Sequence, residues 1–212
     1  MRALGRFLLW SLVGLVVVIG GLRLTVLRWW RVPDDDPYLE ASIAPALKGG
    51  DWVLLWRLGP PPLGSLVMCP EPKHPERVVI GRLVGEPGET VKVDSSRLLV
   101  KDKAMPREGA CANARFSVAS PHDGSLHEQH CTTEVIKGLV HEKGEVDPTE
   151  ALPVYEAEVG ADEALLISDN RLFPYDSRDY GPVSREDCPE SVFFRLIGKE
   201  GFLGERRFTY IR

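Results

Sequence analysis

The sequence predicts a mostly β protein that begins with one apolar helix. Its length is the first observation, because 212 residues suffice for one medium domain or two closely joined lobes with a buried core. The second is a single long apolar run close to the N-terminus. The third is the remainder, where Val, Leu and Ile recur in short runs between scattered Gly and Pro residues, which is typical of strands and turns.

Residues 1–31 are predicted to form an N-terminal transmembrane anchor. The stretch 7–22 is apolar apart from one serine, and Leu-Thr-Val-Leu extends it past Arg23 to residue 27. A helix over 7–27 covers about 31 Å at about 1.5 Å per residue, which spans a bilayer if Arg23 extends its guanidinium toward the headgroups. We expect Trp29 and Trp30, with the arginines beside them, to form an interfacial belt.

A cleaved secretory signal is the alternative for this segment. No small-x-small cleavage site follows the apolar run, whose flank reads RLTVLRWWR, so the anchor is favoured. Basic residues lie on both sides of the run, and the positive-inside rule therefore leaves the orientation open.

The remaining elements are predicted from short apolar runs and from the Gly and Pro residues that separate them along the chain. A polar hinge with Pro33 and Pro37 separates the helix from the body. Short apolar runs bounded by Gly and Pro predict strands, and the Lys-Asp-Lys sequence at 101–103 predicts a hairpin turn. The expected strands lie in 51–58, 64–69, 77–84, 89–93, 97–100, 163–168 and 191–198.

Composition divides the body into a core in two parts, 32–104 and 158–212, and an inserted lobe or loop region, 105–157. The insert holds four of the five histidines and few apolar runs. Cys111 and Cys131 bracket its polar stretch and are the favoured disulfide pair. Cys69 lies in an apolar run and is interpreted as a buried free thiol.

Charge excludes one class of partner. After residue 31 the chain has 21 basic and 31 acidic residues, a net charge of −10. An acidic body without a basic patch argues against a nucleic-acid partner.

Four blocks in sequence order resemble one protein family. They read SIAPALKGGDWVLL, GSLVMCPEP, VVIGRLVGEPGETV and SDNRLFPYDSRDYGPV, and they start at residues 42, 64, 78 and 168. Behind an N-terminal anchor, this order resembles type I signal peptidase, a membrane-anchored serine–lysine endopeptidase that removes signal peptides. The resemblance implies a coiled β-barrel-like core with a smaller inserted lobe.

The resemblance also implies roles for particular positions. Ser42 matches the nucleophile, whose proton a buried, neutral lysine takes in this family. Residues that match the polar motif of the last block are expected to build turns and internal ion pairs. They are Asp169, Asn170, Arg171, Asp176, Ser177 and Arg178.

Three catalytic positions of the family are occupied by other residues. Gly81 stands at the general-base lysine, Glu40 at the serine that helps hold the oxyanion, and Pro174 at the serine that orients the lysine. A carboxylate at 40 would repel a developing oxyanion. The sequence therefore predicts an impaired or inactive site that retains binding of extended peptides along a strand edge.

An active peptidase with a relocated base remains the alternative. Lys48, Lys73 and His74 are the candidate bases in this chain, and a neighbouring subunit is another source. A metal-binding or redox module in the insert is the second alternative, from His122, the His127–Cys131 run and Cys111. Because the metal-ligand spacing is lacking, we expect no metal and no other cofactor.

Partners and location follow from the resemblance. It implies exported preproteins or extended peptides as ligands, a lipid bilayer as the supporting surface, and a possible active paralogue or membrane partner. It also implies a single pass through the cytoplasmic membrane with the body on the outer face.

Overall fold

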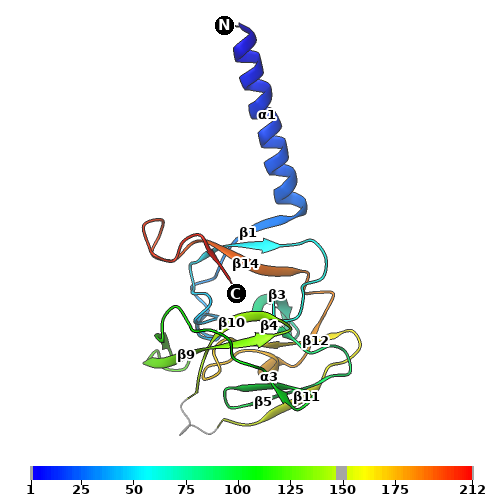
Figure 1. Ribbon diagram of the computed structural model, residues 1–212, viewed down its shortest axis with the longest axis vertical. Helices are drawn as coiled ribbons and strands as arrows, with labels where there is room; N and C mark the ends of the chain where they lie inside the picture. Colours follow the sequence, from blue (N-terminus) through cyan, green and yellow to red (C-terminus); the bar gives the residue numbers. More distant parts are fainter. Residues whose placement is uncertain (1, 147–151, 212) are drawn as a thin grey trace.

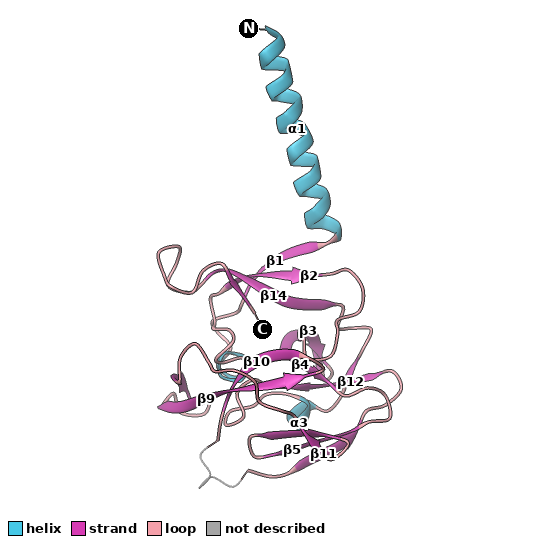
Figure 2. Ribbon diagram, viewed as in Figure 1, coloured by secondary structure: helices cyan, strands magenta, loops and turns pink. Residues whose placement is uncertain are grey.

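A computed structural model describes residues 2–146 and 152–211 of the chain. Within these residues the chain forms an N-terminal helix, two short helices and a set of antiparallel strands, as the sequence predicts for a mostly β protein (Figures 1 and 2). The helices are α1 (Arg2–Thr25), α2 (Pro37–Ser42) and α3 (Ser177–Tyr180).

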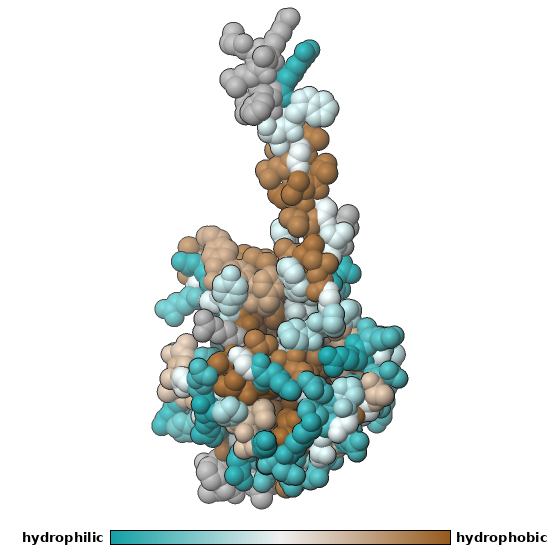
Figure 3. All heavy atoms as spheres, turned by 45° about the vertical axis from the view of Figure 1, so that its right-hand side comes forward, coloured by the Kyte–Doolittle hydropathy of each residue, from teal (hydrophilic) through white to brown (hydrophobic). Residues whose placement is uncertain are grey.

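Helix α1 projects away from the body, and the apolar side chains described along it face outward (Figures 1 and 3). Trp10, for example, is 72% exposed. Among the described residues, no helix combines the length and the apolar character needed to cross a membrane. The transmembrane part of the prediction for residues 1–31 is therefore not confirmed by the structure.

The helix ends at Thr25, two residues before the expected end at residue 27, and β1 (Leu27–Arg31) follows it. β1 pairs with β2 (Trp52–Trp56) over its whole length, and Trp30 packs against a buried cluster of the body. Trp29 remains half-exposed. Aromatic residues favour a half-buried strand, so the Trp-Trp pair belongs to the sheet and does not extend the helix.

An eight-stranded antiparallel sheet forms the centre of the body. Its strand order is β1-β2-β14-β3-β4-β12-β13, and β15 pairs with β14 outside this path. The strands not yet bounded are β3 (Leu66–Glu71), β4 (His74–Val84), β12 (Glu163–Ile167), β13 (Val183–Ser184), β14 (Glu190–Ile197) and β15 (Thr209–Tyr210).

Two smaller sheets complete the body and modify the predicted division. The three-stranded sheet has the order β10-β9-β8 and the four-stranded sheet β11-β5-β6-β7. Within the predicted insert 105–157, the described residues form strands β8 to β10, while β11 at its end pairs with β5 of the core. The bounds are β5 (Thr90–Asp94), β6 (Arg97–Val100), β7 (Lys103–Ala104), β8 (Arg115–Ala119), β9 (Leu126–Ile136), β10 (Leu139–Gly144) and β11 (Tyr155–Glu158).

The central sheet separates two buried apolar clusters. Val79 and Leu83 of β4 belong to one cluster and Ile80 to the other. This follows from strand geometry, because successive side chains point to opposite faces. From Val79 to Val84 β4 is therefore buried on both faces, which limits what can replace the glycine between Ile80 and Arg82.

Two disulfides cross-link the body, and one of them corrects the sequence interpretation. Cys69 of β3 is bonded to Cys188, which precedes β14, and so it is not a free thiol. The pairing was missed because the two residues are 119 positions apart and meet only through the sheet. The second disulfide joins Cys111 and Cys131, the pair that the sequence favoured.

Candidate active site

Ser42 ends α2 with its side chain buried. The helix begins there because Asp36 caps it, accepting the backbone N–H groups of Tyr38 and Leu39, and Pro37 occupies its first position. The Ser42 Oγ donates to the Leu39 carbonyl at 3.0 Å, and the Ser42 carbonyl accepts the Asn170 N–H at 3.0 Å. In the described residues, no lysine or histidine side chain hydrogen-bonds to this hydroxyl.

Gly81 lies in the middle of β4, opposite Val67 of β3. A Cβ atom placed on it would lie 2.9 Å from the Leu166 Cβ and 3.4 Å from the Ile167 backbone N and O atoms of β12. Leu166 and Ile167 are buried and paired with β4. A side chain at this position, including a lysine, therefore requires β12 to move.

Glu40 and Pro174 cannot do what the expected serines would do, which is to donate to an oxyanion and to orient a lysine amine. The Glu40 carboxylate is partly exposed and lies 3.7 Å from the Lys199 Nζ. Pro174 has no hydroxyl with which to orient an amine. The neighbouring Phe173 packs against the buried cluster of Ala41, Ala44 and Val118 beside the serine. An apolar contact thus lies next to Ser42 on this side.

The residues that match the family's polar motif form a buried framework behind α2. The Arg82 guanidinium donates to both Asp169 carboxylate oxygens, at 2.8 and 2.9 Å. Asp176 caps α3 and accepts from Arg178, and the Ser177 Oγ accepts the Leu166 N–H at 2.9 Å. These bonds hold the loop after β12 against β4 and α2.

Asn170 and Arg171 extend the same framework. The Asn170 side-chain oxygen accepts the N–H groups of Leu172 and Phe173, which closes the turn. Arg171 donates to the Ser168 and Ser96 carbonyls and, at 2.5 Å, to Glu134 of β9. The loop is thereby joined to the insert.

Two of the three residues considered as relocated bases contact carboxylates elsewhere, and the third is exposed. The Lys48 Nζ lies 4.0 Å from Glu200, and the His74 Nδ1 lies 3.6 Å from Glu76. Lys73 is exposed in the turn between β3 and β4. The structure does not bring any of the three into a hydrogen bond with Ser42 among the described residues.

Comparison with known proteins decides the family. The family model described as "Signal peptidase, peptidase S26" matches residues 6–197, which is most of the chain. The chain belongs to the signal peptidase family. "Signal peptidase I V" of Bacillus subtilis (strain 168) is 26% identical over 126 residues, and the match covers 58% of this chain and 59% of that protein.

A solved structure with some similarity is a signal peptidase I from Enterococcus faecalis V583. It is 19% identical, with a TM-score of 0.41, and the match covers 63% of this chain and 97% of that one. The chain thus spans about 59% of the length of the curated signal peptidase relative, and residues 198–212 lie outside the family match.

The sequence did not indicate that two titratable residues of this signal peptidase family member are buried near the polar framework. His141 of β10 lies with its Nε2 3.6 Å from Glu134 and 3.8 Å from Asp169, and neither ring nitrogen has a hydrogen-bond partner in the described residues. Burial lowers the pKa of His141 well below its usual value, and Arg82, Arg171 and Lys143 add to this effect. The imidazole is therefore neutral at neutral pH.

Lys143 is the second of these residues. Its Nζ donates to the Ser96 carbonyl at 2.7 Å, and burial lowers its pKa to about 8. The sequence carries little sign that Lys143 is buried, because three polar residues in a row, His141-Glu142-Lys143, are typical of an exposed segment. The fold buries Lys143, and its amine reaches the turn between β5 and β6 at Ser96.

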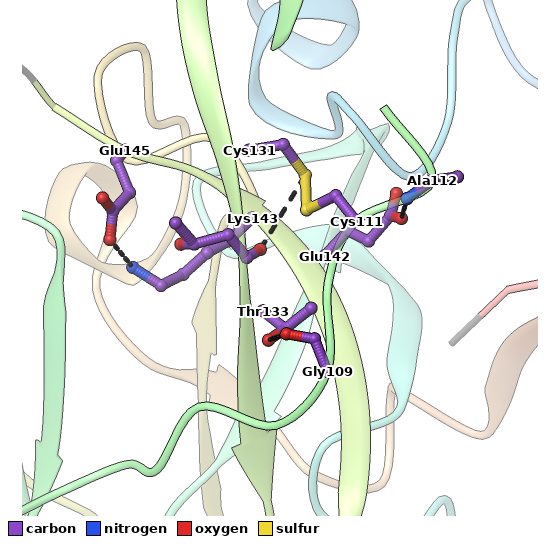
Figure 4. Close-up of a disulfide and its surroundings, with 9 residues drawn as sticks. Gly109, Cys111, Ala112, Cys131, Thr133, Glu142, Lys143 and Glu145 are labelled. Carbon is purple, nitrogen blue, oxygen red and sulfur yellow. Dashed lines mark hydrogen bonds and ion pairs between the residues drawn. A yellow bond between two sulfur atoms is a disulfide. The ribbon is translucent and has the colours of Figure 1, made fainter. Parts of the chain in front are cut away.

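The insert does not present the thiolates that a metal site would use. Cys111 and Cys131 lie close to the Glu142 carboxylate, but the two sulfurs are bonded to each other (Figure 4). Glu142 accepts the Ala112 N–H at 2.8 Å. Since thiolates are the usual cysteine ligands, the disulfide removes the sulfur ligands of the metal alternative.

A cavity of about 980 Å³ lies beside residues 40–51, which contain Ser42 and are called here the serine segment. Ala41, Ala44 and Pro45 line one side of it, and Phe116 and Val118 of β8 line another. The segment after β14 also contributes to the lining, with residues between Lys199 and Ile211. The cavity is thus enclosed by the serine segment, the insert and the C-terminal segment.

Proposed function

We propose that this chain is a membrane-associated signal peptidase family protein whose serine site does not catalyse and which binds extended peptides. The activity of the family is endoproteolytic removal of signal peptides from exported preproteins by a serine endopeptidase. The proposal rests above all on one observation, the hydrogen bond of the buried Ser42 hydroxyl to the Leu39 carbonyl.

A serine nucleophile needs a base that accepts its proton. Here the hydroxyl proton is directed to a backbone carbonyl, which is not a base. The position of the family's lysine is a glycine without room for a Cβ atom. Loss of a general base typically lowers the rate by about 10²–10⁴-fold, and the loss is larger when linked groups are missing together.

The missing oxyanion donor adds to this deficit. A carboxylate at position 40 carries a negative charge two residues before the serine, where a hydroxyl donor would favour the transition state. Its ion pair with Lys199 gives Glu40 a structural use in place of a catalytic one.

Binding of an extended peptide needs fewer groups than cleavage. β8 is an edge strand of its sheet, and its residues Phe116 and Val118 line the cavity beside the serine segment. An edge strand next to a cavity supports strand addition, with backbone hydrogen bonds for affinity and pockets for alternate side chains.

Ser42→Ala tests the catalytic part of this proposal. We expect the purified full chain in detergent to leave a preprotein uncleaved over hours, with the same result for the Ser42→Ala variant. Cleavage by the unaltered chain that Ser42→Ala abolishes would overturn the proposal in favour of an active peptidase. In that case His141→Ala, Lys48→Ala, Lys73→Ala and His74→Ala would identify the base.

Association with a membrane is part of the same proposal. Hydrophobic residues gather along α1 and on the part of the body next to its base (Figure 3). Trp29, Trp52 and Trp56 of the two strands that follow α1 are each partly exposed, and interfacial Trp residues favour the headgroup region. The proposed location is the cytoplasmic membrane with the body on the outer face, where an oxidising compartment suits two disulfides.

Membrane fractionation tests this location. We expect the full chain to sediment with membranes and to resist extraction at alkaline pH, because apolar side chains of α1 leave water on insertion. A variant lacking residues 2–25 is expected to be released by the same treatment. Recovery of the full chain in the soluble fraction would contradict the proposal.

A further inference from the structure

The segment after β14, residues 198–211, folds back onto the sheet and is called here the C-terminal strap. It makes a loop beside β14 (orange to red in Figure 1) and returns as β15. The Phe208 N–H donates to the Leu196 carbonyl at 3.2 Å, and the Ile211 N–H donates to the Phe193 carbonyl at 2.9 Å. The family match ends at residue 197, immediately before the strap.

The strap occupies part of a strand edge that would otherwise be free. One edge of β14 pairs with β2 from Ser191 to Ile197. The other edge pairs with β3 only from Glu190 to Val192, and β15 then pairs with Phe194 and Arg195. β15 therefore pairs with the part of this edge that β3 does not reach. Without β15, the backbone groups of β14 at this edge would be unpaired and could pair with another strand.

The occupied edge faces the cavity beside Ser42. Tyr210 and Ile211 of the strap line this cavity, and they also line a second one of about 740 Å³ that reaches Trp56 and Phe193. An extended peptide that entered from either side would meet the strap.

Ion pairs hold the strap to the serine segment. The Lys199 Nζ lies 3.7 Å from Glu40, and the Glu200 carboxylate lies 4.0 Å from the Lys48 Nζ. Arg206 reaches the buried Asp51 carboxylate at 3.3 Å. Every one of these partners lies within residues 40–51, the stretch that contains Ser42.

We propose that the C-terminal strap is an intramolecular strand ligand that competes with extended peptides for the edge of β14. This inference rests on the proposed peptide-binding function, and it adds a second strand edge, that of β14, across the same cavity from the edge of β8. The preferred competitor is an extended segment that resembles Phe208-Thr209-Tyr210-Ile211, with amide donors for the Phe193 and Leu196 carbonyls and alternating bulky side chains. The apparent affinity of β14 for this competitor rises in proportion to the fraction of molecules in which the strap is released.

The pairs Glu40–Lys199 and Lys48–Glu200 allow a test without a change of net charge. Exchanging the strap residues (Lys199→Glu with Glu200→Lys) places like charges opposite Glu40 and Lys48. Exchanging the serine-segment residues (Glu40→Lys with Lys48→Glu) does the same. All four changes together restore both pairs, and this quadruple variant is the matched control.

The probe is the neutral peptide acetyl-Phe-Thr-Tyr-Ile-amide, added to the full chain in detergent at low salt. Because exposed pairs contribute about 0.2–1 kcal/mol each, we expect the two double variants to bind it about fivefold more tightly than the unaltered chain. The quadruple variant is expected to return to the original affinity. A peptide with Pro in place of Ile lacks the amide that Ile211 uses, and it should bind more weakly to every variant.

Hydrogen exchange at the Phe208 and Ile211 amides supplies a second readout. We expect faster exchange in both double variants and recovery in the quadruple variant. Equal peptide affinity in all variants, absence of binding to the double variants, or unchanged exchange would overturn the proposal. Cleavage of a preprotein by the unaltered chain would overturn the proposed lack of catalysis instead, and it would leave the affinity ratio between variants as it is.

Discussion

Asp169→Asn is expected to lower the free energy of unfolding by about 3–5 kcal/mol, because it removes one charge of a fully buried ion pair. The Arg82 guanidinium is 2% exposed and donates to both oxygens of this carboxylate. An amide presents one acceptor oxygen in place of two and carries no charge. Urea unfolding of the full chain in detergent, followed by tryptophan fluorescence, measures the change.

Two further variants distinguish the effect of breaking this buried ion pair from the effect of removing any carboxylate charge. Asp94→Asn alters an exposed carboxylate that lies 3.4 Å from Arg97, and it should change stability by less than about 1 kcal/mol. Arg82→Met combined with Asp169→Leu removes both charges and should recover a large part of the loss. If Asp169→Asn and Asp94→Asn prove equally mild, the framework behind the serine does not depend on this pair.

Gly81→Lys is expected to leave preprotein cleavage absent and to destabilise the protein by more than about 3 kcal/mol. The new Cβ atom would lie 2.9 Å from the Leu166 Cβ, and the amine would enter a covered face of the sheet. Overpacking typically costs about 1–3 kcal/mol, and a buried amine adds to that cost. Thermal unfolding and a preprotein cleavage assay on the same preparation measure both effects.

A double-mutant cycle locates the cause of this destabilisation. Gly81→Ala should destabilise the chain by about 1–3 kcal/mol. Leu166→Ala keeps the Cβ atom at 2.9 Å and should give no relief, whereas Leu166→Gly removes it and should make Gly81→Ala nearly neutral. Suppose instead that Gly81→Lys cleaves the preprotein and that adding Ser42→Ala abolishes this cleavage. This result would show that β12 can move to make room for a lysine side chain.

Much of the β structure was predictable from local pattern. The run at 51–58 contains β2, and the runs at 64–69 and 77–84 overlap most of β3 and β4. The Lys101-Asp102 turn joins β6 to β7 with positive φ at both residues. Such elements depend on alternation and turn chemistry within a few residues, which the chain carries locally.

Errors arose where a distant partner decides the outcome. Residues 27–31 form a strand because β2 pairs with them. Cys69 is oxidised because Cys188 lies beside it in the fold. His141 and Lys143 are buried by distant parts of the chain, although their own stretch is polar. His141 lies beside Asp169 after β12, and Lys143 donates to Ser96 between β5 and β6.

The sequence by itself determined the resemblance to the family and the residues at the positions that this resemblance marks as catalytic, which are Ser42, Gly81, Glu40 and Pro174. Only the tertiary structure decided what surrounds them. Leu166 fills the space at Gly81, and Lys199 of the strap pairs with Glu40. The physical reason is distance along the chain, because contacts between residues about 85 or 159 positions apart are set by strand pairing and close packing, which a local pattern does not encode.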